Sequence, residues 1–338
     1  MARSLRTAAC ALALSVTLGV TPAFASTTIS PANPGGIASP TSPNGVPGAG
    51  VGPEFHTFVA ARTYATAHLG STPGGANDFS CRPKAGQRPI VLIPGTGEDA
   101  FSTWAMYAPQ LAASGYCVFT FNYNPQISAL TGKTMDDWPF TGDIRSSAAF
   151  MAGFVDRVLA ATGSDKVTLI GHSQGGGPLP RSYLKWYGGA TKVDQVIGIV
   201  PSNHGTTAYG INTLYLALGP NRQDSVLSAA DSLNMTGWAQ QLSASSFMAD
   251  LNAGGDTVAG VRYTVITTVW DQVVVPYASA YLRGDNVTNI LVQDRCPLDA
   301  YTHLNATYDP VAFQYVRNAL DPENSRPVRC VWIPPYVV

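Results

Sequence analysis

The sequence predicts an α/β fold in which a mostly parallel central sheet carries helices on both faces. Short apolar runs rich in β-branched residues, typical of buried strands, recur along the chain. Segments with apolar residues every three or four positions, typical of amphipathic helices, lie between them. Strands that alternate with helices favour parallel pairing, because a parallel crossover needs a connecting element over the sheet. We therefore expect one large domain over residues 54–338.

Strands and helices are expected in a regular order along the chain. The strands are predicted at 88–93, 116–121, 167–170, 195–200, 262–269 and 289–292. The helices are predicted at 106–114, 143–161, 179–187 and 310–320. The helix at 143–161 has the most regular apolar spacing, and Gly163 follows it as a stop signal.

The strand at 167–170 runs directly into Gly171-His172-Ser173-Gln174-Gly175, a match to the Gly-x-Ser-x-Gly pattern. A strand, a sharp turn and a helix are the context of a nucleophile elbow, in which glycines let the backbone fold tightly around a serine. The pentapeptide alone fits a Gly/Ser-rich loop before a helix equally well. The preceding strand and the partner residues described below favour Ser173 as a nucleophile.

Residues 1–25 are predicted to be a secretory signal peptide. Arg3 and Arg6 form its basic start, residues 8–20 its apolar stretch, and 23–25 an Ala-Phe-Ala cleavage site. The apolar stretch is too short for a membrane anchor, and no other run approaches the ~20 apolar residues of a transmembrane helix. We therefore expect a secreted, extracellular protein without a transmembrane anchor.

Residues 26–53 are rich in Pro, Gly, Ser and Thr and carry almost no charge. Such a stretch buries too little apolar surface to offset its ordering entropy, so a flexible leader is predicted. The whole chain has 12% charged residues, a formal net charge of −1 and no cluster of Lys and Arg. Nucleic acids and anionic membranes are therefore not expected as partners, and the protein is expected to act as a monomer.

The cysteine pattern predicts two disulfides. Cys10 leaves with the signal peptide, and the four remaining cysteines would lie in an oxidising compartment. Of the three possible pairings, Cys81–Cys117 and Cys296–Cys330 are favoured because each pair brackets one contiguous structural unit. The sequence has neither a Cys-x-x-Cys pair nor a Cys/His cluster, so we expect no metal site.

A serine hydroxyl needs a base to take its proton, and that base needs an orienting carboxylate. After a nucleophile elbow the acid comes next along the chain and then the histidine, each on a loop that follows a strand. His303 alone satisfies this order, with a plain surface-loop histidine as the alternative. His56 and His68 precede the sheet, and His172 lies inside the elbow. His204 follows the next strand, where a structural hydrogen-bonding role is favoured.

Asp271 is the predicted acid, because it directly follows the strand at 262–269 inside an otherwise apolar run. Asp256 precedes that strand and would lie at the wrong end of the sheet. Asp294 lies nine residues before His303 and is the second choice.

An oxyanion needs N–H donors that are already in place. The Gln174 amide, directly after the nucleophile, is one candidate. The Thr96 amide in the loop after the first strand is the other, and its hydroxyl could add a further donor. The alternative for residues 94–97 is a plain tight turn.

The segments 94–97, 173–176 and 271–276, with the late loop histidine, resemble α/β-hydrolase lipases of the yeast lipase B type. The segment 90–123 and its flanking cysteines resemble the secreted bacterial class 2 lipases. The likeness spans roughly residues 81–330 and is weakest in the middle. At Gly171 and His172 the yeast type has threonine and tryptophan, so the wall of the pocket is expected to differ.

This resemblance implies an α/β-hydrolase fold with a helical cap or lid insertion. It also implies the same site and cysteine pairs: Ser173, Asp271 and His303 as the triad, Thr96 and Gln174 as the oxyanion hole, and Cys81–Cys117 and Cys296–Cys330 as disulfides.

A long segment between the strands at 195–200 and 262–269 exceeds what a sheet crossover needs. We interpret roughly 203–258 as a helical cap that lines an apolar acyl pocket, with packing against the body as the alternative. Its apolar residues are Tyr209, Ile211, Leu214, Tyr215, Leu216, Leu218, Trp238, Leu242, Phe247 and Met248.

The expected function is hydrolysis of carboxylic esters through an acyl-enzyme, without any cofactor. A lipase that acts on triacylglycerol or other fatty-acyl esters, at a lipid–water interface, fits best. A polyester depolymerase or a short-chain esterase would use the same triad. A non-catalytic binding protein on the same scaffold is the least favoured alternative, because it would carry a damaged triad.

Overall fold

The computed structural model describes residues 48–334. The predicted signal peptide and most of the predicted leader therefore lie outside the described residues. The end of the leader is hydrogen-bonded: Gly50 N donates to Ala76 O over 2.7 Å and Gly52 N to Thr72 O over 3.2 Å. Hydrogen-bonded structure thus begins before residue 54, because the backbone at 50–52 pairs with the segment 72–76.

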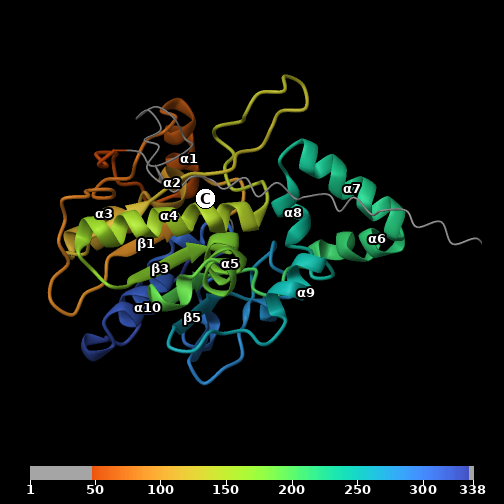
Figure 1. Ribbon diagram of the computed structural model, residues 1–338. Helices are drawn as coiled ribbons and strands as arrows, with labels where there is room; N and C mark the ends of the chain where they lie inside the picture. Colours follow the sequence, from red (N-terminus) through yellow and green to blue (C-terminus); the bar gives the residue numbers. More distant parts are fainter. Residues whose placement is uncertain (1–47, 335–338) are drawn as a thin grey trace, which may run out of the picture. The chain divides into compact units, whose positions relative to one another are not determined.

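Six parallel strands form one sheet in the order β2-β1-β3-β4-β5-β6 (Figure 1). Their bounds are β1 Ile90–Ile93, β2 Val118–Thr120, β3 Val167–His172, β4 Val193–Ile199, β5 Arg262–Thr267 and β6 Val287–Leu291. Each predicted strand is present, with ends that differ by a few residues. The fully parallel pairing confirms the predicted fold class.

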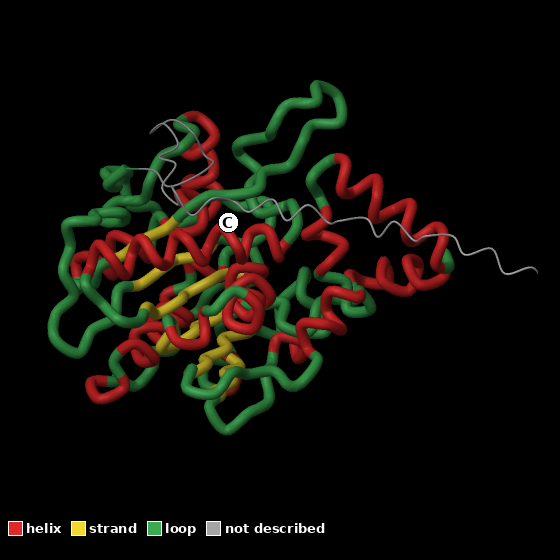
Figure 2. The backbone as a smooth tube through the Cα atoms, in the orientation of Figure 1, coloured by secondary structure: helices red, strands yellow, loops and turns green. Residues whose placement is uncertain are grey.

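Alternating strand residues divide the interior into two clusters on opposite faces of the sheet. In β1, Val91 and Ile93 join one cluster, whereas Ile90 and Leu92 join the other. The first face is covered by α4 Ile144–Thr162, α5 Pro178–Trp186 and α9 Ser246–Asn252. The second face is covered by α1 Phe58–Ala67, α2 Ala100–Trp104, α3 Tyr107–Ala113 and α10 Pro310–Leu320. Strands therefore lie between two helical layers (Figure 2).

Helix α4 illustrates how the sequence sets the ends of an element. Asp143 caps its start by accepting a hydrogen bond from Ser146 N over 2.7 Å. Gly163 ends it with a left-handed φ of 71°, a conformation that glycine adopts without strain. The predicted helix at 143–161 is confirmed, as are those at 106–114, 179–187 and 310–320, which correspond to α3, α5 and α10.

The segment between β4 and β5, here called the insertion, contains α6 Ile211–Ala217, α7 Pro220–Ser232, α8 Thr236–Gln240 and α9. Figure 1 shows α6 and α7 at its outer end. Phe247 and Met248 on α9 are buried against the body, whereas Ile211, Leu214 and Leu216 on α6 are exposed. The insertion therefore packs on the body through α8 and α9 and leaves an apolar outer helix in solvent. None of the helices within residues 48–334 is long and apolar enough to cross a membrane.

Both predicted disulfides are present. Cys81 bonds to Cys117, which fixes the segment before β1 to the start of β2. Cys296 bonds to Cys330, which fixes the C-terminal segment to the loop after β6. The same C-terminal segment accepts a backbone hydrogen bond at Ile333 O from Ala300 N over 2.9 Å. The second disulfide thus supports the loop that carries His303.

Candidate active site

The sharp turn after β3 holds Ser173 in a strained conformation, with φ of 53°. This turn requires glycine on both sides. A Cβ at Gly171 would lie 1.7 Å from Gly175 O, and one at Gly175 would lie 2.2 Å from Pro94 O. The backbone of the turn therefore packs directly on itself and on the loop after β1, as a nucleophile elbow requires.

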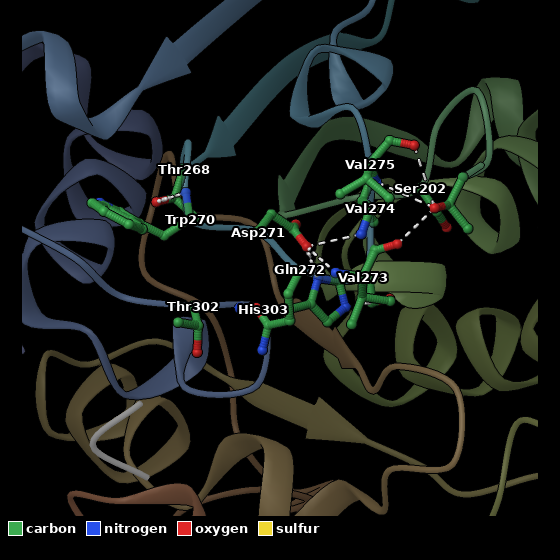
Figure 3. Close-up of polar contacts among 12 residues, drawn as sticks. Ser202, Thr268, Trp270, Asp271, Gln272, Val273, Val274, Val275, Thr302 and His303 are labelled. Atoms are coloured by element: carbon green, nitrogen blue, oxygen red, sulfur yellow. Dashed lines mark hydrogen bonds and ion pairs between the residues drawn. The ribbon is translucent and has the colours of Figure 1, made fainter. Parts of the chain in front are cut away.

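Ser173, His303 and Asp271 come together although they are far apart in the sequence. His303 Nε2 lies 2.9 Å from Ser173 Oγ, and His303 Nδ1 lies 3.0 Å from both carboxylate oxygens of Asp271. All three side chains are buried. Figure 3 shows His303 pointing at Asp271 from the opposite loop. A serine, an imidazole and a carboxylate in this chain of contacts can pass a proton from the hydroxyl to the imidazole.

Asp271 owes its orientation to the loop that follows β5. Its Oδ1 accepts hydrogen bonds from Val273 N and Val274 N, each over 2.8 Å (Figure 3). The same loop reaches the histidine a second time, because His303 N donates to Gln272 Oε1 over 3.0 Å. The carboxylate and the imidazole are therefore fixed against each other by main-chain and side-chain contacts.

The rival residues lie elsewhere. Asp256 Oδ1 lies 3.0 Å from His204 Nε2, and His204 Nδ1 lies 3.0 Å from Ser279 O. His204 thus has the structural hydrogen-bonding role that the sequence favoured. Asp294 is exposed in a short 3-10 helix after β6.

The other predicted residues lie near the serine. Thr96 is in the loop after β1, and its Oγ1 accepts hydrogen bonds from Gln174 Nε2 and Gln241 Nε2, each over 2.8 Å. Gln241, which follows α8, was missed by sequence reasoning. No local pattern marks it, since its role depends on the insertion folding back over the loop.

A second buried acid–histidine pair was also missed. His172 Nδ1 lies 2.8 Å from Glu98 Oε2, and His172 Nε2 lies 2.9 Å from His303 O. His172 lies inside the recognised elbow and Glu98 directly follows the recognised turn at 94–97, but nothing in the sequence linked these two residues. The pair therefore places a further charged contact directly behind the histidine of the site.

Two carboxyl groups lie close to His303 in the sequence: Asp299 in the loop that carries it, and Asp309 at the start of α10. Asp299 Oδ1 accepts a hydrogen bond from Tyr301 N, and Asp309 caps α10 by accepting from Val311 N and Ala312 N. Burial raises the pKa of Asp309 to about 8 and that of Asp299 to about 6. Each carboxyl interacts with the other, so the pair retains a proton near neutral pH.

We expect the protein to lose stability as the pH rises from about 4 through about 8. In this window the unfolded carboxyls release protons that the folded pair retains, and each retained proton contributes a slope of at most about 1.4 kcal/mol per pH unit. Asp309→Asn keeps one of the two oxygens that cap α10 and removes one carboxyl, so the unfolding free energy should be lower but depend less on pH. Denaturant titrations at several pH values test this.

The control for this experiment is Asp143→Asn. Asp143 also caps a helix, but its side chain contacts Ser146 and Gln240 instead of a second carboxyl group. Asp143→Asn should retain the pH slope of the unchanged protein. A full slope in Asp309→Asn would contradict the shared proton.

No group of three or more His, Cys, Asp or Glu side chains suited to a metal ion occurs within residues 48–334.

Comparisons with known proteins agree with this fold and these motifs. Triacylglycerol lipases of Pseudarthrobacter phenanthrenivorans and Burkholderia plantarii are each 36% identical over 93 residues, which is 26% of this chain. The match spans only 25% and 23% of the length of those two relatives.

Two solved lipase structures share the fold. Aspergillus fumigatus lipase B has a TM-score of 0.55 and 24% identity, covering 76% of this chain and 56% of that one. Bacillus licheniformis lipase BlEst2 has a TM-score of 0.51 and 17% identity, covering 71% and 94% respectively. Both likenesses identify the α/β-hydrolase fold.

The family model of class 2 lipases matches residues 87–316, from the start of the sheet to α10. This region holds the elbow turn, the Asp271 loop and the His303 loop. Because the match covers more than half of the chain and includes all three loops, the protein belongs to the class 2 lipase family.

Proposed function

We propose that this protein is a secreted lipase that hydrolyses fatty-acyl esters, triacylglycerol among them, through an acyl-enzyme. The contact chain Ser173–His303–Asp271 carries the proposal. Ser173 Oγ attacks the ester carbonyl while His303 Nε2 takes its proton. His303 then gives that proton to the leaving alcohol, and water repeats the sequence to release the acid. Asp271 holds the imidazole and stabilises its charged form.

Thr96 is proposed as a donor to the oxyanion together with the Gln174 amide. The side-chain amide of Gln174 donates to Phe140 O as well as to Thr96 Oγ1, and the side-chain amide of Gln241 donates to Gly237 O as well as to Thr96 Oγ1. These carbonyls fix both amide groups so that their N–H bonds point at Thr96 Oγ1. An oxygen that accepts two hydrogen bonds has its own hydrogen free for a third partner. The developing oxyanion is that partner, and the donor is already oriented before the reaction.

Thr96→Val should lower kcat on p-nitrophenyl butyrate by about 10²–10³ with little change in KM, because the hydroxyl acts on charge that forms only in the transition state. Thr96→Ser keeps the hydroxyl and should retain most of the activity. Equal kcat values for the Val variant and the unchanged enzyme would remove Thr96 Oγ1 from the oxyanion hole.

Apolar side chains border the same loop. A Cβ on Gly97 would lie 2.8 Å from the Trp138 ring and 3.6 Å from the Trp238 ring, so both indoles pack against the loop next to Thr96. Trp138 is 38% exposed and Trp238 is 42% exposed, which leaves apolar surface for an acyl chain. This surface supports a fatty-acyl substrate.

Activity on p-nitrophenyl esters from acetate to palmitate, and on emulsified triolein, tests the proposed substrate class. Each methylene that becomes buried contributes about 0.8 kcal/mol, so kcat/KM should rise with chain length until the apolar surface is filled. Triolein should be hydrolysed as well. A maximum at acetate with no triolein hydrolysis would indicate a short-chain esterase, and no hydrolysis of any ester would refute the proposal.

Export is proposed from the two disulfides, since stable disulfides are typical of oxidising compartments. Mass spectrometry of protein recovered from culture medium tests this. A mature N-terminus at Ser26 is expected, after the predicted cleavage site.

A further inference from the structure

We propose that Glu98 and His172 form a buried ion pair that positions both His303 and the oxyanion loop for the reaction. This inference rests on the proposed function, since it assigns positioning residues to the Ser173–His303–Asp271 site. Glu98 comes from the loop after β1 and His172 from the end of β3, so the pair bridges two elements of the site. Neither side chain belongs to the proton-transfer chain itself.

The hydrogen bonds of His172 require a proton on Nε2 and assign one to Nδ1. Nε2 lies 2.9 Å from His303 O, and a carbonyl can only accept, so Nε2 donates. Nδ1 lies 2.8 Å from Glu98 Oε2. That oxygen already accepts from Gly95 N over 3.3 Å, as expected for a carboxylate, whereas the Thr103 hydroxyl, also 3.3 Å away, has a shorter bond of 2.8 Å to Asp99 O. His172 is therefore an imidazolium that donates from both nitrogens.

The surroundings agree with this charge state. Burial by itself lowers the pKa of His172, but the Glu98 carboxylate outweighs it and the pKa is raised. Burial by itself raises the pKa of Glu98, but His172 outweighs it and the pKa is lowered. Both residues are buried, so the charges face each other without water between them.

One carboxylate oxygen thus ties two parts of the site together. Glu98 Oε2 contacts Gly95 N, next to Thr96 in the oxyanion loop, and it contacts His172 in the elbow. A Cβ on Gly95 would lie 2.8 Å from His172 Nδ1, so the loop packs directly on the imidazole ring. Movement of either residue would therefore shift the oxyanion donors relative to Ser173.

The pair also fixes the main chain of His303. His303 O accepts from His172 Nε2, and His303 N donates to Gln272 Oε1 over 3.0 Å. The backbone of the proposed base is held from two sides, so its ring keeps the direction that Ser173 Oγ requires. The rings of His172 and His303 lie 4.8 Å apart, and the Glu98 charge neutralises His172 there. His303 can then accept a proton without an unpaired cation beside it.

Glutamine at position 98 cannot replace the carboxylate. If its oxygen faces Nδ1, a neutral His172 has no proton left for His303 O. If its amide nitrogen faces Nδ1, that nitrogen also meets the Gly95 N–H. Glu98→Gln therefore breaks one contact whichever way the amide turns, although its size is unchanged.

The molecule offers a matched control. His204 also bridges a carboxylate and a backbone carbonyl, with Asp256 Oδ1 at 3.0 Å and Ser279 O at 3.0 Å. Those partners belong to segments other than the oxyanion loop and the His303 loop. His204→Gln therefore removes the same kind of interaction without loosening the contacts that position His303.

The experiment compares Glu98→Gln, His172→Gln, the double variant and His204→Gln. We expect Glu98→Gln and His172→Gln to lower kcat on p-nitrophenyl butyrate by about 10–100-fold, with little change in KM. The concentration of active enzyme is measured by titration with a serine-directed phosphonate, so that unfolded protein does not count as lost activity. The double variant should lose about as much as either single variant, because the two residues act as a unit. His204→Gln should stay within about 3-fold of the unchanged enzyme. The proposal would be overturned if Glu98→Gln and His172→Gln raised KM without lowering kcat, or lowered kcat no more than His204→Gln does. It would also be overturned if the losses in kcat of the two single variants added up in the double variant.

A measurement on the unchanged enzyme keeps the proposal testable if a variant fails to fold. ¹⁵N NMR of histidine-labelled protein should show both ring nitrogens of His172 protonated over a range around neutral pH. An unprotonated Nδ1 in that range would refute the ion pair. The activity of Ser173→Ala is measured in parallel. If this variant stays active, the proposed function fails. The protonation state of His172 is measured without any hydrolysis, so its result tests the ion pair separately.

Discussion

Ser173→Ala should lower ester hydrolysis by about 10⁴–10⁶, the largest loss that we expect from any single substitution. In serine hydrolases, removal of the nucleophile leaves only the weak acceleration from substrate binding and the oxyanion donors. The substitution removes one oxygen from a side chain that is already buried, so the fold should remain intact. Initial rates on p-nitrophenyl butyrate, with circular dichroism as the check on folding, measure the loss.

Ser182→Ala is the matched control. Ser182 is buried on α5, close in sequence to the elbow, and its hydroxyl has no hydrogen-bond partner among the described residues. Its replacement should leave the rate unchanged. A serine-directed phosphonate should modify Ser173 alone, and modification of another serine would contradict the assignment of the nucleophile.

Asp271→Asn should lower kcat by about 10⁴, as the equivalent change does in serine proteases. The reason lies in the two backbone amides of Val273 and Val274, which both donate to Asp271 Oδ1. In the variant, the amide oxygen must take this position, so the amide nitrogen faces His303 Nδ1. Both carboxylate oxygens lie 3.0 Å from Nδ1, so an N–H group in place of Oδ2 opposes a hydrogen on Nδ1. This favours the tautomer with the hydrogen on Nε2, which cannot accept the proton of Ser173.

Asp294→Asn is the comparison that distinguishes the two candidate acids. Its carboxylate is exposed to solvent, and screening by water leaves it little influence on the site. Its kcat should stay close to that of the unchanged enzyme. If Asp294→Asn lost activity and Asp271→Asn kept it, the acid of the proposed triad would be wrong.

Much of the fold could be predicted from the sequence because its signals are local. Runs such as 90–93 and 167–170 are apolar on both sides of the strand, which is how strands covered on both faces by helices must look. The ends of α4 were predictable from Asp143 and Gly163, whose capping geometry depends only on neighbouring residues. The bounds of α6 and α7 were not, since their apolar residues remain in solvent.

Part of the candidate site could be predicted for a similar reason. The Gly171–Gly175 turn needs its glycines for steric reasons, so the position of Ser173 is visible in the chain itself. Asp271 and His303 each follow a strand end, and the carboxyl ends of parallel strands lie at one edge of the sheet. The order of motifs therefore indicated which side chains would meet, though not how they would be held.

The sequence by itself predicted the parallel α/β fold, the tight turn around Ser173 and the two loops, of Asp271 and His303, that meet beside it, because each depends on local geometry and on strand order. Only the tertiary structure decided that Glu98 bonds to His172, that Gln241 reaches Thr96, and that Asp299 meets Asp309. These contacts join segments from different loops, and their energies depend on burial. Burial removes water, so a charge or hydrogen-bond donor without a protein partner costs free energy. The burial of these polar contacts depends on how separate loops pack together, so no pattern within one segment of the chain could reveal them.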